Sequence, residues 1–134
     1  MCFEYHQLAG RRVCVTHLAD TLAFFYTDTG GRAVAVARYW FVERGNVRGV
    51  TDSIRSALAQ VYGPGERCPR TAQFVQSHAW EAEWRWAVGE GQVTLWAAEP
   101  RPPSRQVPFV QIHHTMVRLD CGVRYAQPQP RIRM

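Results

Sequence analysis

The stretch from Trp80 to Ala98, WEAEWRWAVGEGQVTLWAA, decides the fold because it contains two strand patterns joined by a glycine-rich turn. Between residues 80 and 88, large apolar residues alternate with charged or small ones, which is the period of a β-strand with one buried face. One face is expected to carry Trp80, Ala82, Trp84, Trp86 and Val88, and the other to carry Glu81, Glu83 and Arg85.

The turn of this hairpin predicts how its two strands pair. Glu90-Gly91 is expected to form a two-residue turn, which places Trp86 opposite Leu95. A shift of one residue would move the whole apolar set to the other face and is therefore disfavoured. The predicted register leaves Trp96 on the polar face, beside Arg85.

Glycine and proline residues divide the rest of the chain into short segments of the same kind. Strands are expected over residues 12–18, 21–28, 33–42, 80–88, 92–98 and 107–120. Both faces of strand 33–42 are apolar, which indicates a central strand or one that a partner covers. A change of apolar period near His113-His114 predicts a β-bulge in the last strand.

A single helix is expected over residues 52–62, between the third and fourth strands. Thr51 can cap its first turn, and Gly63-Pro64 ends it. Its apolar stripe consists of Ile54, Leu58 and Val61. We therefore expect an α+β fold, in which a largely antiparallel sheet of about six short strands, in the order β-β-β-α-β-β-β, carries one helix on one face.

The composition is that of a single globular domain with a short tail. The chain has 134 residues and is 46 % hydrophobic, which is enough for a core. We expect a domain over residues 1–121 and a basic, proline-containing tail over residues 122–134. The domain has 13 arginines and 11 acidic residues, a net charge of +2, and the chain is arginine-rich and lysine-free. This near balance gives weak support to a phosphate-binding face.

The cysteines and the apolar runs bear on metals, redox state and membranes. The four cysteines, Cys2, Cys14, Cys68 and Cys121, form no CxxC pair and no zinc-finger spacing. We expect reduced thiols, with Cys14 and Cys121 as the candidate sheet neighbours, and neither a metal nor a cofactor.

No apolar run approaches the ~18 residues of a membrane span. The first residues show no signal-peptide pattern, and the sequence indicates no particular compartment.

Glu81 and Glu83 form the sharpest local chemical pattern. Carboxylates two residues apart on a strand share a face and can change each other's pKa. The pattern resembles the Glu-x-Glu motif of mono-ADP-ribosyltransferases, and the resemblance implies an NAD-binding enzyme whose acid stabilises positive charge beside the nicotinamide ribose. The Ser-Thr-Ser strand of that family is missing. The alternative is a solvated strand face on which Arg85 neutralises the carboxylates.

The function class that these patterns favour is a non-enzymatic binding module, acting through a sheet face or edge on a protein partner or a second copy of the chain. Its candidate residues combine tryptophan with arginine, as protein interfaces do: Trp96, Arg85, Arg38 and Trp40. The alternative is nucleic-acid binding, in which stacked tryptophans act together with the tail arginines Arg124, Arg131 and Arg133. A small ADP-ribosyltransferase-like enzyme that uses Glu81 and Glu83 is a third hypothesis.

Overall fold

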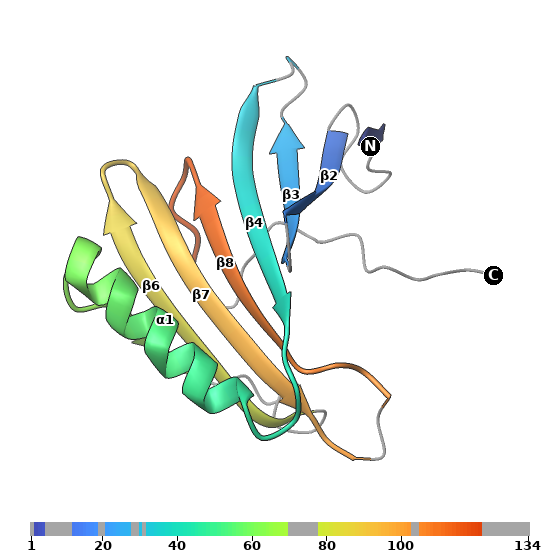
Figure 1. Ribbon diagram of the computed structural model, residues 1–134. Coiled ribbons are helices and arrows are strands. Elements are labelled where there is room, and N and C mark those ends of the chain that lie inside the picture. The colour runs from blue at the N-terminus through green and yellow to red at the C-terminus, as the bar shows by residue number, and fades with distance from the viewer. Residues whose placement is uncertain are drawn as a thin grey trace.

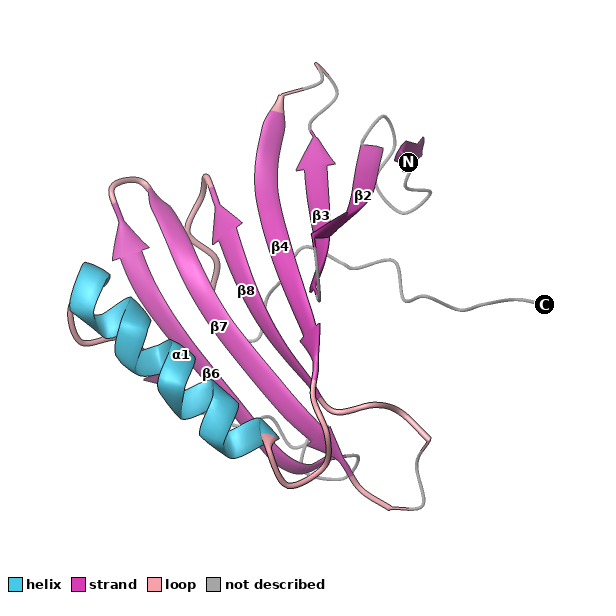
Figure 2. Ribbon diagram, in the orientation of Figure 1, coloured by secondary structure: helices cyan, strands magenta, loops and turns pink. Residues whose placement is uncertain are grey.

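The computed structural model describes residues 2–4, 12–18, 21–27, 30, 32–69, 78–102 and 105–121. These residues form one antiparallel sheet and one helix (Figure 1), and Figure 2 shows the helix lying along one side of the sheet. The strands are β1 (Cys2–Glu4), β2 (Arg12–Leu18), β3 (Thr21–Thr27), β4 (Ala33–Phe41), β5 (Glu66–Cys68), β6 (His78–Val88), β7 (Gly91–Pro100) and β8 (Phe109–Thr115). The helix is α1 (Val47–Tyr62).

The strands lie in the order β1-β2-β3-β4-β8-β7-β6-β5, and every neighbouring pair is antiparallel. The six longer strands follow the order β-β-β-α-β-β-β along the chain, which confirms the predicted α+β fold. The two three-residue strands, β1 and β5, extend the sheet on either side. Strand β4 pairs with both β3 and β8, so its two apolar faces belong to a central strand, as predicted.

Helix α1 packs on one face of the sheet, which we call the helix face, and its main contacts are with β6, β7 and β8 (Figure 1). The core beneath it is formed by Val47 of the helix together with Trp86, Val93, Leu95, Ala97, Val110 and Ile112 of these strands. Burying one such side chain stabilises the fold by about 1.5–3 kcal/mol, depending on its size. This cluster therefore lies in one half of the sheet, between α1 and strands β6 to β8, while β3 and β4 contribute further buried residues, Ala23, Tyr26, Ala35 and Ala37.

Helix α1 begins at Val47 rather than at residue 52, so it is longer than predicted. Asn46 takes the N-cap position, and Thr51 lies inside the helix, where its hydroxyl donates to the Val47 carbonyl oxygen at 2.6 Å. The sequence pattern missed the first turn because it contains Gly49, which disfavours helices. Burial of Val47 in the core compensates for that preference.

The β6–β7 hairpin confirms the predicted faces but not the predicted pairs. Gly89-Glu90 form the turn, not Glu90-Gly91, and the glycine adopts a positive φ of 58°. Trp84 consequently lies opposite Leu95. Because the register differs by two residues, each side chain keeps its face. Glycine adopts the left-handed turn conformation without steric cost, and this fixes the position of the turn.

Strand β8 ends at Thr115 and contains no bulge at His113-His114, in contrast to the predicted strand over residues 107–120. Its pairing with β4 and with β7 continues without a shift through both histidines. The apolar period changes because the chain leaves the sheet after Thr115. A change of direction of the chain and a bulge produce the same sequence pattern.

Residues 116–121 contact the face of the sheet that lies away from α1, which we call the opposite face. The Leu119 amide donates to Gln92 Oε1 at 3.2 Å. The Arg85 guanidinium donates to the Leu119 carbonyl oxygen. Polar side chains of β6 and β7 therefore hold this segment.

The same segment ends in a disulfide, because Cys121 is bonded to Cys68 of β5, 53 residues earlier in the chain. This corrects both the expectation of reduced thiols and the choice of Cys14 as the neighbour of Cys121. The backbone register instead places Cys14 opposite Cys2. The strand pattern could not predict the Cys68–Cys121 pair, because it depends on the turn that the chain makes after β8.

Among the described residues, no helix is long and apolar enough to cross a bilayer. The predicted tail over residues 122–134 lies outside the described residues.

Candidate functional site

The four candidate partner-binding residues form two pairs on different faces of the sheet. Arg38 and Trp40 belong to β4, and Arg38 lies opposite Ile112, a core residue of the helix face. Arg85 and Trp96 alternate with the core residues of β6 and β7 and lie on the opposite face. Directly paired residues of antiparallel strands point to the same side. No single surface therefore contains all four residues.

The Arg85–Trp96 pair lies within the fold. The Arg85 side chain is 5 % exposed, and its Nε donates to Glu83 Oε2 at 3.0 Å. Trp96 is half-buried, and its ring meets the Phe109 ring edge-on with the centroids 4.7 Å apart. These contacts stabilise the opposite face, and they leave little of Arg85 accessible to a partner.

The two carboxylates of the Glu-x-Glu pattern are buried beside this pair, with Glu81 4 % and Glu83 3 % exposed. The alternative expectation of a solvated strand face is therefore wrong. Their neighbours on this face are also buried and polar: Gln92, Thr94, Gln111, His113 and Thr115. Buried polar groups are stabilised by hydrogen bonds to one another. Here the Gln92 amide donates to Thr94 Oγ1 at 2.9 Å, and the His113 ring is hydrogen-bonded to Gln111 Oε1.

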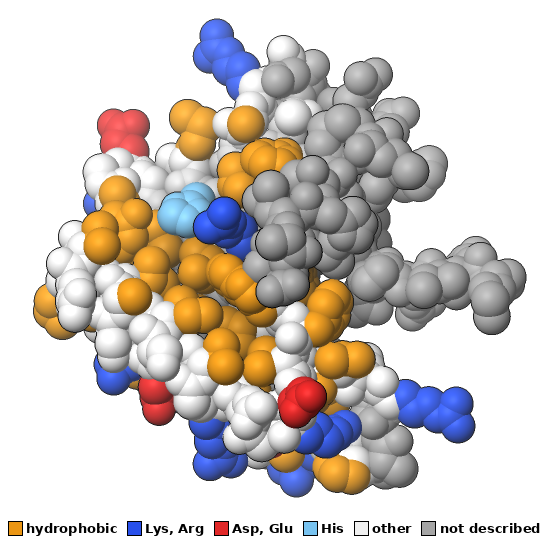
Figure 3. Space-filling view, in the orientation of Figure 1, with side chains coloured by type: hydrophobic (Ala, Val, Ile, Leu, Met, Phe, Trp, Pro, Cys, Tyr) orange, Lys and Arg blue, Asp and Glu red, His pale blue; other side chains and the backbone are white. Residues whose placement is uncertain are grey.

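The accessible part of the helix face lies over β4 and over the end of β8 at His114, because Val110 and Ile112 of β8 are buried in the core beneath α1. A helix is about 10 Å wide and covers about two strands spaced about 4.8 Å apart, and α1 lies over β6, β7 and β8. Figure 3 shows hydrophobic side chains gathered beside α1, over β8 and β4. We call this accessible part the β4–β8 surface, and it consists of Val34, Val36, Arg38, Trp40 and His114. Of these side chains, Arg38 and His114 are exposed and the other three are half-buried.

The flank of α1 next to the β4–β8 surface is apolar. At 3.6 residues per turn, Val50, Ala57 and Val61 share one flank. The other flank faces β6, where two cation–π contacts form, Arg48 with Trp80 and Arg55 with Trp84. Val61, predicted to lie in the buried stripe, is 72 % exposed. It therefore lies exposed on this flank of the helix instead of filling the core.

Arg38 and His114 are the ionisable residues that β4 and β8 contribute to the helix face. The register places Val36 opposite His114, so Arg38 lies one step further along the same face. Burial lowers the pKa of His114 below its usual value of 6.5, and the positive charge of Arg38 lowers the pKa further. The surface thus has one permanent positive charge, at Arg38, beside a histidine whose neutral form is favoured.

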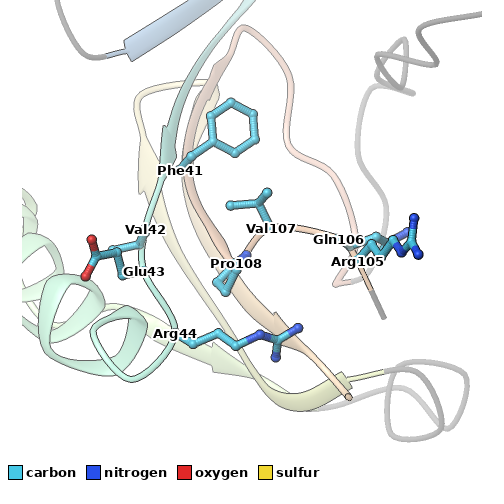
Figure 4. A pocket seen from close by; sticks show the side chains of 8 residues that line it. All are labelled: Phe41, Val42, Glu43, Arg44, Arg105, Gln106, Val107 and Pro108. Atoms are coloured by element: carbon cyan, nitrogen blue, oxygen red, sulfur yellow. The ribbon is translucent and has the colours of Figure 1, made fainter. Parts of the chain in front are cut away.

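A separate depression lies at the end of β4, between residues 41–44 and 105–108 (Figure 4). It is open to solvent, has a volume of about 670 Å³, and has apolar walls at Phe41 and Val107. Figure 4 shows its Glu43, Arg105 and Gln106 side chains directed away from its centre. Small-molecule sites usually have polar groups that converge on the ligand, and this depression does not show that arrangement.

Comparison with protein-family models, with characterised proteins and with solved structures gives no significant match. Function must therefore be inferred from the residues themselves. The tail arginines Arg124, Arg131 and Arg133 lie outside the described residues, so the structure adds nothing to the hypothesis that they bind nucleic acid.

Sequence reasoning missed two groupings. It did not associate His114 with Arg38, because the pairing of β4 with β8 is not evident from the sequence. It also missed the grouping of Cys68 with Cys121, because 53 residues separate them. The grouping of His114 with Arg38 could have been found from the sequence by asking which other predicted strand offers an apolar face that matches strand 33–42.

Proposed function

We propose that this chain is a non-enzymatic binding module whose β4–β8 surface binds an acidic amphipathic helix of a partner protein. The observation that carries the proposal is that the described residues place one helix on the helix face, over β6 to β8, while the central strand β4 presents a half-exposed apolar row beside it. This apolar row contains Val34, Val36 and Trp40.

The shape of the surface favours a helix as the occupant. A second helix laid beside α1 would cover about two strands, which is the distance from β8 to β4. It would bury Val36 and Trp40 on the sheet and Val61 on the flank of α1. Amphipathic helices bind such surfaces through apolar residues spaced three, four and seven apart. Trp40 and Arg38 are also residue types that dominate interface energetics.

The charge of the surface favours an acidic partner over a second copy of the chain. Arg38 is exposed and permanently charged, whereas burial and Arg38 lower the pKa of His114 and favour its neutral form. In a symmetric dimer formed through this surface, the Arg38 residues of both copies would be brought into one interface. Like charges brought together at an interface are unfavourable. A glutamate or aspartate on a different chain would instead pair with Arg38.

A peptide selection tests the proposal without knowledge of the natural partner. A displayed library of random peptides of about 16 residues is selected against the wild-type chain. The enriched peptides should combine a helical apolar spacing with acidic residues, and Arg38→Glu should weaken their binding by about tenfold or more. The matched control is Arg105→Glu, which changes the charge equally at an exposed arginine beside the other depression. It should leave binding unchanged.

A second matched pair tests the apolar part of the surface. Val61→Ser should weaken the same peptides, whereas Val107→Ser, at another exposed valine, should not. Peptides that bind equally well to wild-type, Arg38→Glu and Val61→Ser proteins would contradict the proposal. Dimerisation that Arg38→Glu abolishes would also contradict it. So would steeply salt-dependent retention of a single-stranded oligonucleotide without any peptide enrichment.

A further inference from the structure

The disulfide on the opposite face lies beside a buried carboxylate. Cys68 in β5 pairs directly with Glu83 in β6, and Cys121 reaches the same point from the segment that follows β8. The two Sγ atoms and a carboxylate oxygen of Glu83 all lie within 4.8 Å of one another. Three potential metal ligands from distant parts of the chain therefore meet at one place.

These three groups match the ligand preferences of zinc. Zn²⁺ binds cysteine thiolates and carboxylate oxygens, and three protein ligands with one solvent position form a common tetrahedral arrangement. Cys68 and Glu83 are buried, whereas Cys121 is exposed and gives an ion access from solvent. Arg85 Nε donates to Glu83 Oε2 at 3.0 Å and so fixes the orientation of the carboxylate. Hydrogen bonds of this kind commonly orient metal ligands.

The local charges would balance in the metal-bound state. Two thiolates and Glu83 carry three negative charges, and Arg85 with Zn²⁺ carries three positive charges. In the oxidised state the disulfide is neutral, and Glu83 and Arg85 form a neutral ion pair. Counted over Cys68, Cys121, Glu83 and Arg85, both states are therefore neutral, and unbalanced charge is strongly unfavourable inside a protein.

We propose that Cys68, Cys121 and Glu83 form a redox-controlled site for one Zn²⁺ ion. A dithiol reductant transfers two electrons and two protons to the disulfide, which yields two cysteine thiols and the cyclic disulfide of the reductant. Zn²⁺ then displaces one proton from each thiol and forms two Zn–S bonds, with Glu83 as the third ligand. A disulfide oxidant such as oxidised glutathione reverses the sequence: it accepts two electrons from the two thiolates and takes up two protons to become two thiols, while the Cys68–Cys121 bond re-forms and Zn²⁺ is released.

The test uses the full chain, reduced with dithiothreitol under anaerobic conditions and then freed of reductant. Co²⁺ serves as the spectroscopic probe, and Zn²⁺ is then added in competition. The reduced protein should bind one equivalent of Co²⁺ and show thiolate-to-cobalt charge-transfer bands, which Zn²⁺ abolishes. The oxidised protein should show none. Cys68→Ser/Cys121→Ser should lose these bands, whereas the matched control Cys2→Ser/Cys14→Ser should retain them.

The third ligand needs its own measurement, because Glu83→Gln alters a buried ion pair and can also disturb folding. If the variant folds, it should keep the charge-transfer bands but bind Co²⁺ at least tenfold more weakly. X-ray absorption of the wild-type zinc complex should show two sulfur ligands at about 2.3 Å and lighter ligands at about 2.0–2.2 Å. The proposal is overturned if the reduced wild-type chain shows no thiolate-to-cobalt bands, or if these bands persist in Cys68→Ser/Cys121→Ser. Four sulfur ligands in the absorption spectrum would also overturn it.

Discussion

Replacement of Arg85 by methionine removes one half of a buried ion pair on the opposite face of the sheet. The Arg85 and Glu83 side chains are 5 % and 3 % exposed, and 3.0 Å separates Arg85 Nε from Glu83 Oε2. Arg85 also donates to the Leu119 carbonyl oxygen, so it connects β6 to the segment after β8. Methionine has a similar volume but cannot make either contact.

The expected loss of stability is large. Removing one partner of a buried ion pair costs about 3–5 kcal/mol, because the other charge stays in a low-dielectric site. For a urea m-value of about 1.5 kcal/mol/M, the unfolding midpoint should fall by about 2–3 M. The double variant Glu83→Gln/Arg85→Met removes both charges and should recover about 1–3 kcal/mol relative to Arg85→Met alone.

The measurement is equilibrium urea unfolding with the Cys68–Cys121 disulfide intact, followed by tryptophan fluorescence. Arg105→Met, at an exposed arginine, is the control and should change the free energy of unfolding by no more than about 0.5 kcal/mol. A loss below about 1 kcal/mol for Arg85→Met would refute the reasoning, because the pair would then behave as a solvent-exposed one. A double variant less stable than Arg85→Met would refute it as well.

Two further predictions concern pH and glycine. Burial and Arg38 lower the pKa of His114 from 6.5, so the contribution of neutral His114 to stability is full above about pH 6.5 and is lost as the pH falls through the lowered pKa. The variant His114→Gln should therefore show a smaller fall in urea midpoint between pH 7.5 and pH 5 than the wild-type chain. An NMR titration that gives His114 a pKa above 6.5 would contradict this. A Cβ at Gly65 would lie 2.6 Å from the buried Trp86 ring, whereas a Cβ at Gly49 meets nothing within 4 Å. Gly65→Ala should therefore lower the thermal midpoint, and Gly49→Ala should raise the free energy of unfolding by about 0.5–1 kcal/mol. Calorimetry that gives Gly65→Ala a higher thermal midpoint than Gly49→Ala would contradict this.

The fold class could be predicted because local patterns determine it. The strict alternation over residues 80–88 fixes which side chains face the helix, and that assignment does not depend on the position of the turn. The turn itself was misplaced because glycines flank Glu90 on both sides, and both two-residue turns keep the apolar faces together. Only the backbone conformation of Gly89 distinguishes them.

The polar face could not be understood from local pattern alone. Alternation marks Glu81, Glu83 and Arg85 as the less apolar side of a strand, and such a side is normally solvated. Here residues 116–121 contact that side, and their course depends on contacts between residues far apart in the sequence. The same limit applies to the Cys68–Cys121 pair, because the sequence does not indicate which cysteines approach one another.

The candidate binding residues differ in where the structure places them. Tryptophan beside arginine drew attention to Arg38 and Trp40, which lie on the accessible helix face, and their role in binding stays a prediction. The same reasoning selected Arg85 and Trp96, which the structure uses for packing and ion pairing. Residue type alone cannot separate an interface pair from a buried one, since both combine aromatic surface with a fixed guanidinium.

The most direct test of the binding proposal is an NMR titration of the isotope-labelled chain with an acidic peptide enriched in the selection. Binding to the β4–β8 surface should shift the amide signals of Val36, Arg38, His114 and Val61. Shifts that cluster instead around Arg85 and Trp96, or around residues 105–108, would contradict the proposal.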